Sequence, residues 1–488
     1  MSRVVVIGAG LGGLGAALRL QGAGHDVTVV EQRERPGGRA YQLQDGGFTW
    51  DTGPSLITMP WVLEEVFAAG GLDFHSEVQL DRLDPFYRIF WATEPHDKHL
   101  DFVADRDAMK AQIAKFSERD ARAFDGFMAA MKPIYEQGIL GAGRREFSSI
   151  GELARFTPTM VKLGAAYPLA LAVARHFRHP RIREAFSFHS LFIGGGPYRV
   201  PAIYGALVYL QFLDEVWYAR GGVYSVIEAM ARALDVRTSS RVDRIETRAG
   251  RVTGVVLSGG ERLPADVVVS NGDVLRTHAL LGRPAPLRRL KPTMSCFLLY
   301  LGTDRRFEKL QHHTLLVGDG YRRFIRDVTR SGRLPGTYST YLHVPSRTEP
   351  EMARPGGDSI CVLLPVPNLR ARGVDWSEVG ERRLRDALVH DLETTFGLEG
   401  LEASITVEHR MTPRDFQREL GAVDGNAFAV EPTLHQSAAL RTPNRDKAVR
   451  GLYHVGGGTH PGAGIPGVLL GAEVTAGLVM EDTRVAAR

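Results

Sequence analysis

Residues 1–40 of this 488-residue chain are MSRVVVIGAGLGGLGAALRLQGAGHDVTVVEQRERPGGRA. The consecutive β-branched, apolar residues at 4–7 are typical of a strand buried on both faces of a parallel sheet. An alanine- and leucine-rich segment at 14–20 predicts a helix, and the valine-rich run at 27–30 predicts a second strand. This order predicts a βαβ unit.

The turn after the first strand carries a G-x-G-x-x-G motif. Gly8 allows a tight turn, Gly10 lets the backbone approach a pyrophosphate, and Gly13 allows the helix to pack closely on the strand. Glu31 ends the second strand, at about the 20-residue spacing that places an acid on a ribose hydroxyl. We therefore predict a dinucleotide site, against the alternative of a glycine-rich turn without a ligand.

A second motif, Arg35-Pro36-Gly37-Gly38-Arg39, follows the acid at once. In flavoproteins of the amine-oxidase type an R-x-G-G-R segment lies along the pyrophosphate and flavin, and the sequence resembles that superfamily here. Gly38 permits close backbone approach, and Arg39 is able to pair with phosphate oxygens in a bidentate way. The predicted cofactor is FAD; the alternative is an ordinary turn with exposed arginines.

Length and composition indicate a globular protein of two or three domains. The net charge of +4 is mildly basic, and no basic run with interleaved aromatic residues predicts nucleic-acid binding. The two cysteines, Cys296 and Cys361, form no disulfide framework and lack metal-site neighbours, so we predict no metal and a reducing, cytoplasmic compartment. Neither a signal peptide nor a membrane span is expected.

The remaining chain predicts an α/β fold with a Rossmann-like FAD-binding domain, a mixed-sheet substrate domain and a helical, membrane-facing region. The expected elements are helices from about 105 to 235 and at 378–396, and strands at 242–245, 252–257, 265–270, 295–302, 339–344 and 359–367. The predicted domains are 1–75, 236–294 and 436–488 for FAD, 76–105 and 295–435 for substrate, and 106–235 for the helical region.

The C-terminal end combines a strand at 452–455, a loop of small residues at 456–467 and a helix at 468–480. Gly462, Gly464 and Gly467 form another literal G-x-G-x-x-G. We reject a second nucleotide site, because too few residues follow to complete a βαβ unit with its acid. Instead, the helix from Val468 is expected to point its N-terminus at the flavin ring, with orphan N–H groups from Gly464 to Val468 as donors.

Three long segments resemble the bacterial-type phytoene desaturase family: DTGPSLIT at 51–58, the segment from FSFHSLFIGGG to VYSVIEAM at 186–230, and NRDKAVRGLYHVGGGTHPGAGIPGVLLGAE at 444–473. The resemblance covers nearly the whole chain. It implies a non-covalent FAD, a lipophilic polyene substrate such as phytoene, and a cytoplasmic protein associated with the membrane surface.

The resemblance also implies roles for individual residues. Gly8, Gly10, Gly13 and Glu31 would hold the pyrophosphate and ribose, Gly38 and Arg39 the glycine-pair motif, Val242 the adenine through its backbone, and Gly458, Gly464, Gly467 and Val468 the far end of the flavin. Many flavoproteins have Gly-Asp in this last motif, where the aspartate binds the ribityl chain. This chain has Gly457-Gly458, which leaves the ribityl contact unassigned.

Desaturation of a hydrocarbon removes a hydride, which FAD N5 would accept, and a proton, which needs a base. The candidates for the polar catalytic group are Glu184, His189, Asp214, Glu215 and His460, each of which has a structural role as its alternative. The apolar stretches 186–192 and 200–213 are expected to form a substrate tunnel or plain core.

Three functions fit these patterns. The first is an FAD-dependent carotene desaturase that forms neurosporene or lycopene, with a quinone or oxygen as electron acceptor. The second is a carotenoid isomerase, ketolase or retinoid saturase of the same fold. The third is a non-catalytic isoprenoid-binding protein of the Rab-escort type, against which the complete cofactor motifs argue.

A membrane-surface site is also predicted. The largely apolar segment 161–173 is followed by a basic cluster, and an apolar face beside positive charge suits an anionic lipid interface. The alternative is a buried helix that ends in a solvated basic turn. The cluster comprises Arg175, His176, Arg178, His179, Arg181 and Arg183.

Overall fold

The computed structural model describes residues 1–147, 149–284, 286 and 290–486. Its first layer is a five-stranded parallel sheet in the order β19–β13–β1–β2–β9. Val4 and Val6 of the central strand β1 pack into one hydrophobic cluster and Val5 and Ile7 into another, so both faces are buried as predicted. The strands are β1 (Arg3–Ile7), β2 (Asp26–Val30), β9 (Asp235–Arg237), β13 (Val267–Ser270) and β19 (Leu452–His454).

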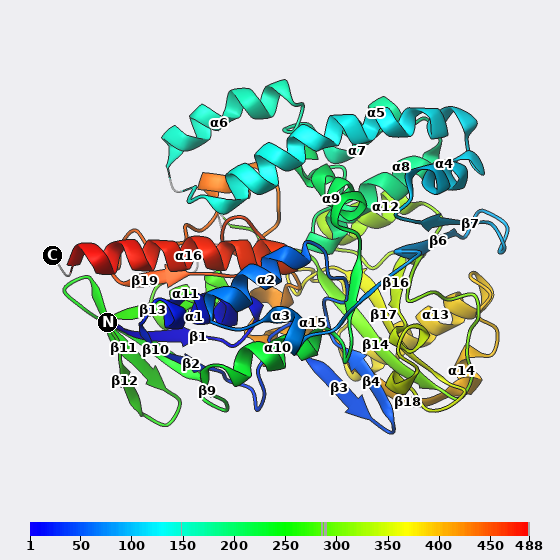
Figure 1. Cartoon of the computed structure of the whole chain (residues 1–488). Coiled ribbons are helices and arrows are strands. Elements are labelled where there is room, and N and C mark those ends of the chain that lie inside the picture. The colour runs from blue at the N-terminus through cyan, green and yellow to red at the C-terminus, as the bar shows by residue number, and fades with distance from the viewer. Residues whose placement is uncertain (148, 285, 287–289, 487–488) are drawn as a thin grey trace.

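The two faces of this sheet are covered differently (Figure 1). Helices α1 (Leu11–Gly22) and α16 (Ile465–Ala486) pack together on the face of Val4 and Val6. The predicted strands at 242–245 and 252–257 form β10 (Val242–Arg248) and β11 (Arg251–Leu257), which with β12 (Arg262–Pro264) make an antiparallel sheet against the opposite face. The sheet therefore has apolar cover on both sides.

A second, seven-stranded sheet has the order β18–β14–β17–β16–β15–β6–β7 and is mixed, because β15 pairs with β6 in parallel and the other pairs are antiparallel. It confirms the strands predicted near 295, 339 and 359. The strands are β6 (Tyr87–Trp91), β7 (His99–Phe102), β14 (Ser295–Thr303), β15 (His313–Val317), β16 (Thr340–His343), β17 (Asp358–Val366) and β18 (Ile405–Met411).

A helical layer lies above the sheets in Figure 1. It contains α4 (Arg106–Ala114), α5 (Glu118–Ile134), α6 (Ile150–Lys162), α7 (Leu169–His176), α8 (Pro180–Ser187) and α9 (Ala206–Asp214). In the described part of the chain, no helix combines the length and apolar character that crossing a membrane requires.

The predicted helical region, 106–235, extends too far at its C-terminal end. β8 (Trp217–Ala219) pairs with β5 (Leu80–Arg82), and α10 (Val223–Arg232) packs on α1 rather than on the helical layer. The reason is that α10 buries one apolar face, and its Met230 reaches the position beside Gly15 of α1. Helical periodicity alone does not say which layer a helix joins.

The remaining elements connect these layers. They are β3 (Gln42–Asp45), β4 (Phe48–Asp51), α2 (Pro60–Ala69), α3 (Phe74–Glu77), α11 (Val274–Leu280), α12 (Tyr321–Arg326), α13 (Glu378–Thr394), α14 (Leu401–Ser404) and α15 (Pro413–Leu420).

Candidate active site

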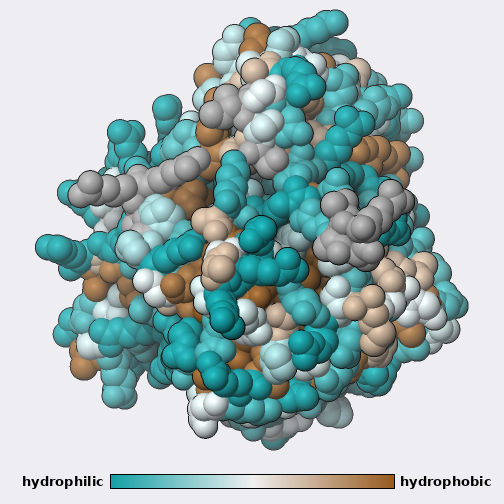
Figure 2. Space-filling model, turned by 90° about the vertical axis from the view of Figure 1, so that its left-hand side faces the viewer, coloured by the Kyte–Doolittle hydropathy of each residue, from teal (hydrophilic) through white to brown (hydrophobic). Residues whose placement is uncertain are grey.

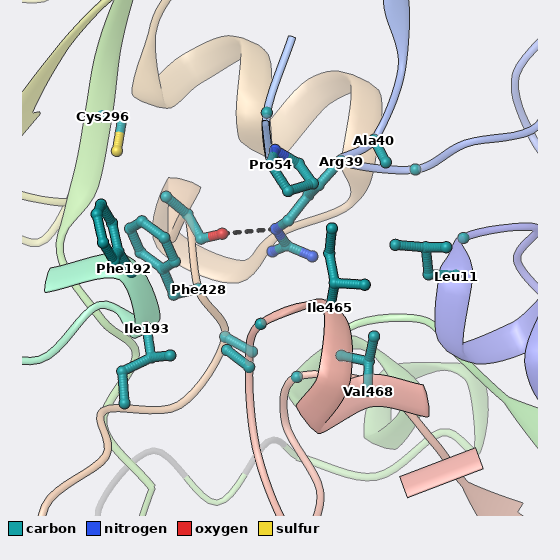
Figure 3. Close-up of a pocket in the computed structure, with 18 of the residues that line it drawn as sticks. Leu11, Arg39, Ala40, Pro54, Phe192, Ile193, Cys296, Phe428, Ile465 and Val468 are labelled. Atoms are coloured by element: carbon teal, nitrogen blue, oxygen red, sulfur yellow. Dashed lines mark hydrogen bonds between the residues drawn. The ribbon is translucent and has the colours of Figure 1, made fainter. Parts of the chain in front are cut away.

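A cavity of about 660 Å³ runs from the carboxyl ends of β1, β2 and β13 to the seven-stranded sheet and the helical layer. This is the edge of a parallel sheet at which ligands bind in doubly wound folds. One end is lined by glycine backbone and a few polar groups, and the other by apolar side chains. Figure 3 shows the region between Leu11 and Phe192, where Arg39, Ile465 and Val468 also lie.

The polar end begins at the turn after β1. Gly8 has a φ of +94°, which favours glycine, and a Cβ at Gly13 would lie 2.1 Å from the carbonyl oxygen of Gly8. Gly10 is the N-cap of α1 and has no capping side chain, so the first turn of the helix presents its N–H groups to the cavity mouth. Gly13 does not line the cavity; it permits the close packing that the sequence predicted.

Glu31 is buried at the carboxyl end of β2 and lines the cavity. Its Oε2 accepts a hydrogen bond from the Ala9 N–H (2.8 Å), and its Oε1 accepts one from the Arg33 N–H (3.0 Å). These bonds fix the carboxylate beside the glycine turn, where a ribose hydroxyl would meet it. Val242 lines the same end of the cavity, next to Ser240.

The glycine pair closes over this turn. Gly37 donates its N–H to the Ala9 carbonyl (2.9 Å), and a Cβ on Gly38 would lie 3.3 Å from the Gly10 Cα. The Arg39 side chain does not fit the bidentate phosphate pairing predicted for it. Its Nε donates to the Ala427 carbonyl (2.6 Å; dashed in Figure 3) and an Nη to Asn426, so the guanidinium fastens a loop of the cavity wall.

The C-terminal loop and α16 form the opposite wall. The helix begins at Ile465, three residues before the predicted start, and Val468 N already donates to the Gly464 carbonyl (2.9 Å). Pro466 has no N–H, so the predicted row of donors reduces to Gly464, Ile465 and Gly467. Gly464, Gly467 and Val468 line the cavity as expected.

Gly458 was predicted at the flavin end but packs elsewhere. A Cβ at this position would lie 2.7 Å from two carbon atoms of Val274, and the residue is not among those that line the cavity. Its neighbour Gly457 lines the cavity and accepts a hydrogen bond from the buried Arg441. Where many flavoproteins have Gly-Asp, this chain therefore has two glycines: Gly458 packs against α11, and Gly457 lines the cavity.

The apolar end is built from the 3-10 segment 188–193, the seven-stranded sheet and the helical layer. The two stretches predicted as tunnel or core contribute to both: some of their side chains line the cavity, while Phe186 and Val208 are fully buried in the core. The cavity-lining members of these stretches are Phe188, Leu191, Phe192, Tyr204, Leu207, Leu210 and Gln211.

Comparison with known proteins identifies the fold and the family. A family model described as flavin containing amine oxidoreductase matches residues 11–480. This chain belongs to that family. It is 39% identical to a lycopene-forming phytoene desaturase from Paracoccus sp. over 98% of this chain and 97% of the relative. It is also 37% identical to a neurosporene-forming phytoene desaturase from Rhodobacter capsulatus, over 98% and 94%.

This flavin oxidoreductase of the phytoene desaturase type has more distant relatives too. A 4,4'-diapolycopene oxygenase from Methylomonas is 29% identical over 98% of both chains. A solved putrescine oxidase variant superposes with a TM-score of 0.66 at 12% identity, covering 99% of each chain, which shows the shared fold.

The polar end of the cavity fits FAD, the cofactor of this family. A Cβ at Gly12 would lie 2.8 Å from Asn271 Oδ1 and 3.2 Å from Gly456, so the backbone around the turn is packed to a limit that leaves no room for side chains. The uncapped N-terminus of α1 suits the pyrophosphate, Glu31 the ribose, and the N-terminus of α16 the flavin ring. When bound, FAD supplies a hydride acceptor.

The five residues predicted as catalytic candidates are all absent from the described cavity lining. His460 turns away from the cavity, with its Nε2 at 2.9 Å from the Ala142 carbonyl and its ring against Phe147. Burial lowers the pKa of His460 to about 4. It holds the C-terminal loop to the helical layer.

The other four candidates also have protein partners. Glu184 accepts hydrogen bonds from Trp91 and Arg181, and burial raises its pKa. Glu215 forms an ion pair with an arginine of β5. Asp214 accepts a hydrogen bond from an indole N–H of α2, and burial raises its pKa. These placements argue against direct contact with a substrate.

His189 comes nearest to the cavity. Its Nε2 bonds with the Tyr87 hydroxyl, which in turn donates to Gln211 Oε1 (2.9 Å), and Gln211 lines the cavity. Burial lowers the pKa of His189 to about 3. A catalytic role for His189 stays a prediction, and it would be indirect, because Tyr87 and Gln211 lie between this imidazole and the cavity.

Several polar residues of the cavity were not predicted. Asn271 follows β13 and donates to the Gly8 carbonyl (3.2 Å), while Ser55 and Tyr341 share a hydrogen bond (2.6 Å) in the apolar end. Ser55 lies in the motif DTGPSLIT, which indicated the family but did not indicate a role for Ser55. Tyr341 lies in a predicted strand, whose pattern does not reveal which face meets a ligand.

The glycine turn leads to a first prediction. Gly10→Val should weaken FAD binding at least about tenfold, or 1.4 kcal/mol, because the side chain would enter the space beside Asn271 and block backbone approach. Flavin absorbance per mole of purified protein measures this. Gly126→Val is the matched control, since Gly126 lies in α5 with open space around it. Full flavin occupancy in a folded Gly10→Val protein contradicts the assignment.

The N-terminus of α16 leads to a second prediction. Gly464→Asp should lower the flavin reduction potential relative to Gly464→Asn by on the order of 30 mV, a tenfold change for two electrons, because a carboxylate opposes the charge of the reduced ring. Gly464 has a φ of +99°, and its nearest neighbour, Ile193, is 3.6 Å away, so both side chains meet the same strain and space. Dye-coupled titration measures both potentials, and equal values would refute the electrostatic explanation.

Proposed function

We propose that this protein dehydrogenates phytoene to a more conjugated carotene, either neurosporene or lycopene. The observation that carries the proposal is one continuous cavity that joins the FAD end to an apolar end lined by residues such as Phe192, Leu316 and Phe428. The names of the relatives at 37–39% identity support the same substrate and both products.

The apolar end is suited to a substrate without polar handles. A hydrocarbon gains binding energy from burial alone, at roughly 25 cal/mol per Å² of apolar surface. A long wall of aliphatic and aromatic side chains supplies such burial along a polyene, whereas a small amine would need a charged or polar partner. The geometry therefore favours a polyene over the amines oxidised elsewhere in this fold.

An oxygenase is the second candidate, because the relative from Methylomonas carries that name at 29% identity. The two activities differ in their products: a desaturase adds double bonds without oxygen atoms, and an oxygenase adds oxygen to the carotenoid. We rank the desaturase first, since the relatives named for that activity are more similar over the same length.

Expression in a phytoene-making host tests the proposed function. We expect pigments with longer conjugation, no oxygenated carotenoid, and no requirement for a nicotinamide cofactor, because the C-terminal glycine motif completes no second nucleotide fold. Chromatography with mass detection of extracted pigments distinguishes neurosporene, lycopene and oxygenated products. Assays with added quinone, with oxygen, or with neither identify the electron acceptor. Unchanged phytoene beside flavin-loaded protein contradicts the proposal.

We also propose that the helical layer binds the membrane surface, from which a lipophilic substrate would enter. Val161, Tyr167 and Leu171 of the α6–α7 region are each about half exposed or more. In Figure 2 hydrophobic residues are interspersed with hydrophilic ones over the upper part of the molecule. Exposed apolar side chains beside exposed arginines are the combination that a shallow interfacial contact uses.

The basic cluster contributes less charge than the sequence predicts. Arg181 pairs with Glu94 and Glu184, and Arg183 donates to the Phe177 carbonyl, so both are engaged within the protein. Arg175 and Arg178 are exposed. The Arg175 guanidinium lies over the Tyr167 ring, 4.6 Å from its centroid. An exposed arginine near a membrane surface is worth about 1 kcal/mol on an anionic bilayer.

Liposome flotation tests this surface. We expect flotation with anionic vesicles that weakens at high salt, and a several-fold loss for Leu171→Asp, because the carboxylate opposes insertion and repels the lipid headgroups. Val379→Asp is the matched control: Val379 is 53% exposed and Leu171 57%, and both occupy the first turn of a helix, but Val379 lies on α13. The proposed membrane-binding surface is wrong if the wild-type protein never floats or if the two variants float to the same extent.

A further inference from the structure

Three histidines are buried side by side behind the wall of the cavity. His313 begins β15, His312 directly precedes it, and His343 ends β16. One ring nitrogen from each lies within 4.8 Å of the others. Buried polar side chains cost stability unless they are hydrogen-bonded, so a cluster in the middle of a sheet invites a functional explanation.

The cluster is connected to the cavity by one hydroxyl. Tyr341 lines the cavity, and its hydroxyl lies 2.6 Å from His313 Nδ1 and 2.6 Å from Ser55 Oγ. The Tyr341 ring also packs edge-on against Phe192 of the apolar wall. A polar atom at the surface of an apolar cavity thus has an imidazole directly behind it.

The cluster is connected to the protein surface on its other side. His343 Nε2 lies 3.2 Å from His312 Nε2, and His312 Nδ1 lies 2.6 Å from the Thr348 hydroxyl. Thr348 is partly exposed. One step lacks a hydrogen bond: His313 Nε2 and His343 Nδ1 have no partner among the described residues. The two rings are stacked with their centroids 5.2 Å apart, so a proton passes between these nitrogens only after the rings reorient.

The proposed reaction requires such a route, and the inference rests on that proposed function. When a saturated CH–CH unit becomes C=C, one C–H bond gives up a hydride with both electrons to the flavin. The neighbouring C–H bond leaves its electron pair in the new double bond and releases a proton. That proton appears inside an apolar cavity, where an isolated charge is strongly disfavoured.

We propose that Tyr341 and His313 accept this proton together and that His343, His312 and Thr348 conduct it to the surface. The Tyr341 oxygen takes the substrate proton as its own hydroxyl proton moves to His313 Nδ1. Ser55 orients the hydroxyl. The first transfer breaks the substrate C–H bond, whose electron pair stays in the new double bond, and forms an O–H bond on Tyr341. Every later transfer breaks one O–H or N–H bond and forms another, so the tyrosine is neutral before and after the step.

The low basicity of the three histidines suits groups that pass a proton on rather than groups that stay protonated. Burial lowers the pKa of His312 and His313 well below the usual range and that of His343 to about 3, and neighbouring imidazoles lower the first two further. A substrate that has lost a hydride is cationic and therefore a strong acid, so a weak base is sufficient. A proton on this cluster is not held and moves on to solvent.

The test compares flavin reduction in single turnovers of FAD-loaded protein with phytoene in anaerobic vesicles, in H₂O and D₂O. Tyr341→Phe removes the hydroxyl, and His313→Gln keeps an acceptor for it but cannot carry a proton. We expect each to slow reduction on the order of 100-fold and to abolish the solvent isotope effect of the wild-type protein. Flavin content and melting temperature establish that each variant is folded. If only one of the two variants folds, that variant alone decides the result.

Tyr453→Phe is the matched control, because Tyr453 is a buried tyrosine whose hydroxyl donates to Asp482 (2.6 Å), away from the cavity lining. It should keep the wild-type rate and isotope effect. If wild type is active while Tyr341→Phe and His313→Gln stay within threefold of its rate with the isotope effect intact, the relay is wrong and the proposed function stands. A stoichiometric divalent metal in purified protein also overturns the relay, since coordinated nitrogens cannot pass protons. No flavin reduction in the wild type rejects the proposed function and the relay with it.

Discussion

The close contact between the first turn of α1 and the strand before it sets the geometry of the whole site. A side chain at Gly13 would collide with the Gly8 carbonyl, so the helix lies directly on the strand. Two residues further along, a Cβ at Gly15 would lie 3.1 Å from Leu469 and 3.3 Å from Ala472, so α16 in turn lies directly on α1. Two helix N-termini from opposite ends of the chain therefore reach the same cavity.

The two ends of the cavity are lined by different groups, one mainly by backbone and the other mainly by side chains. At the polar end glycines expose N–H groups and keep side chains away, which suits a large anionic cofactor that must be approached closely. At the other end, aromatic and aliphatic side chains from three layers of the fold give a surface for a hydrocarbon. The loop around Ala427 lines the same cavity and is held by Arg39, which links the glycine-pair motif to the cavity wall.

Burial disfavours the charged forms of several ionisable groups around the cavity. It lowers the pKa values of His189, His313 and His460, and it raises those of Glu184 and Asp214. A permanently charged base next to a polyene would be costly in such surroundings. Proton transfer here is better served by neutral groups that lie in a row. The row that begins at Tyr341 leads from the cavity to a partly exposed threonine, with one gap in its hydrogen bonding, between His313 and His343.

The sequence by itself determined the βαβ unit, the cofactor and the family. These depend on local patterns: a run of β-branched residues, glycines where the backbone must turn or approach closely, and an acid at a fixed distance. It also located the cavity-lining positions Gly10, Glu31 and Gly467. These positions depend on the backbone conformation of a turn or a strand end, which the neighbouring residues in the sequence determine.

Only the tertiary structure decided where long polar side chains point and which layer each helix joins. His460 sits in the flavin loop by sequence, yet its ring faces Ala142 of a different layer. Arg39 has a phosphate-binding position, yet its guanidinium meets the loop at 426–427. Tyr341 joins Ser55 and His313 only because β15 and β16 pair, and the motif that contains Ser55 packs beside them. A side chain with several rotatable bonds is placed by its neighbours in space, and those neighbours come from segments hundreds of residues apart.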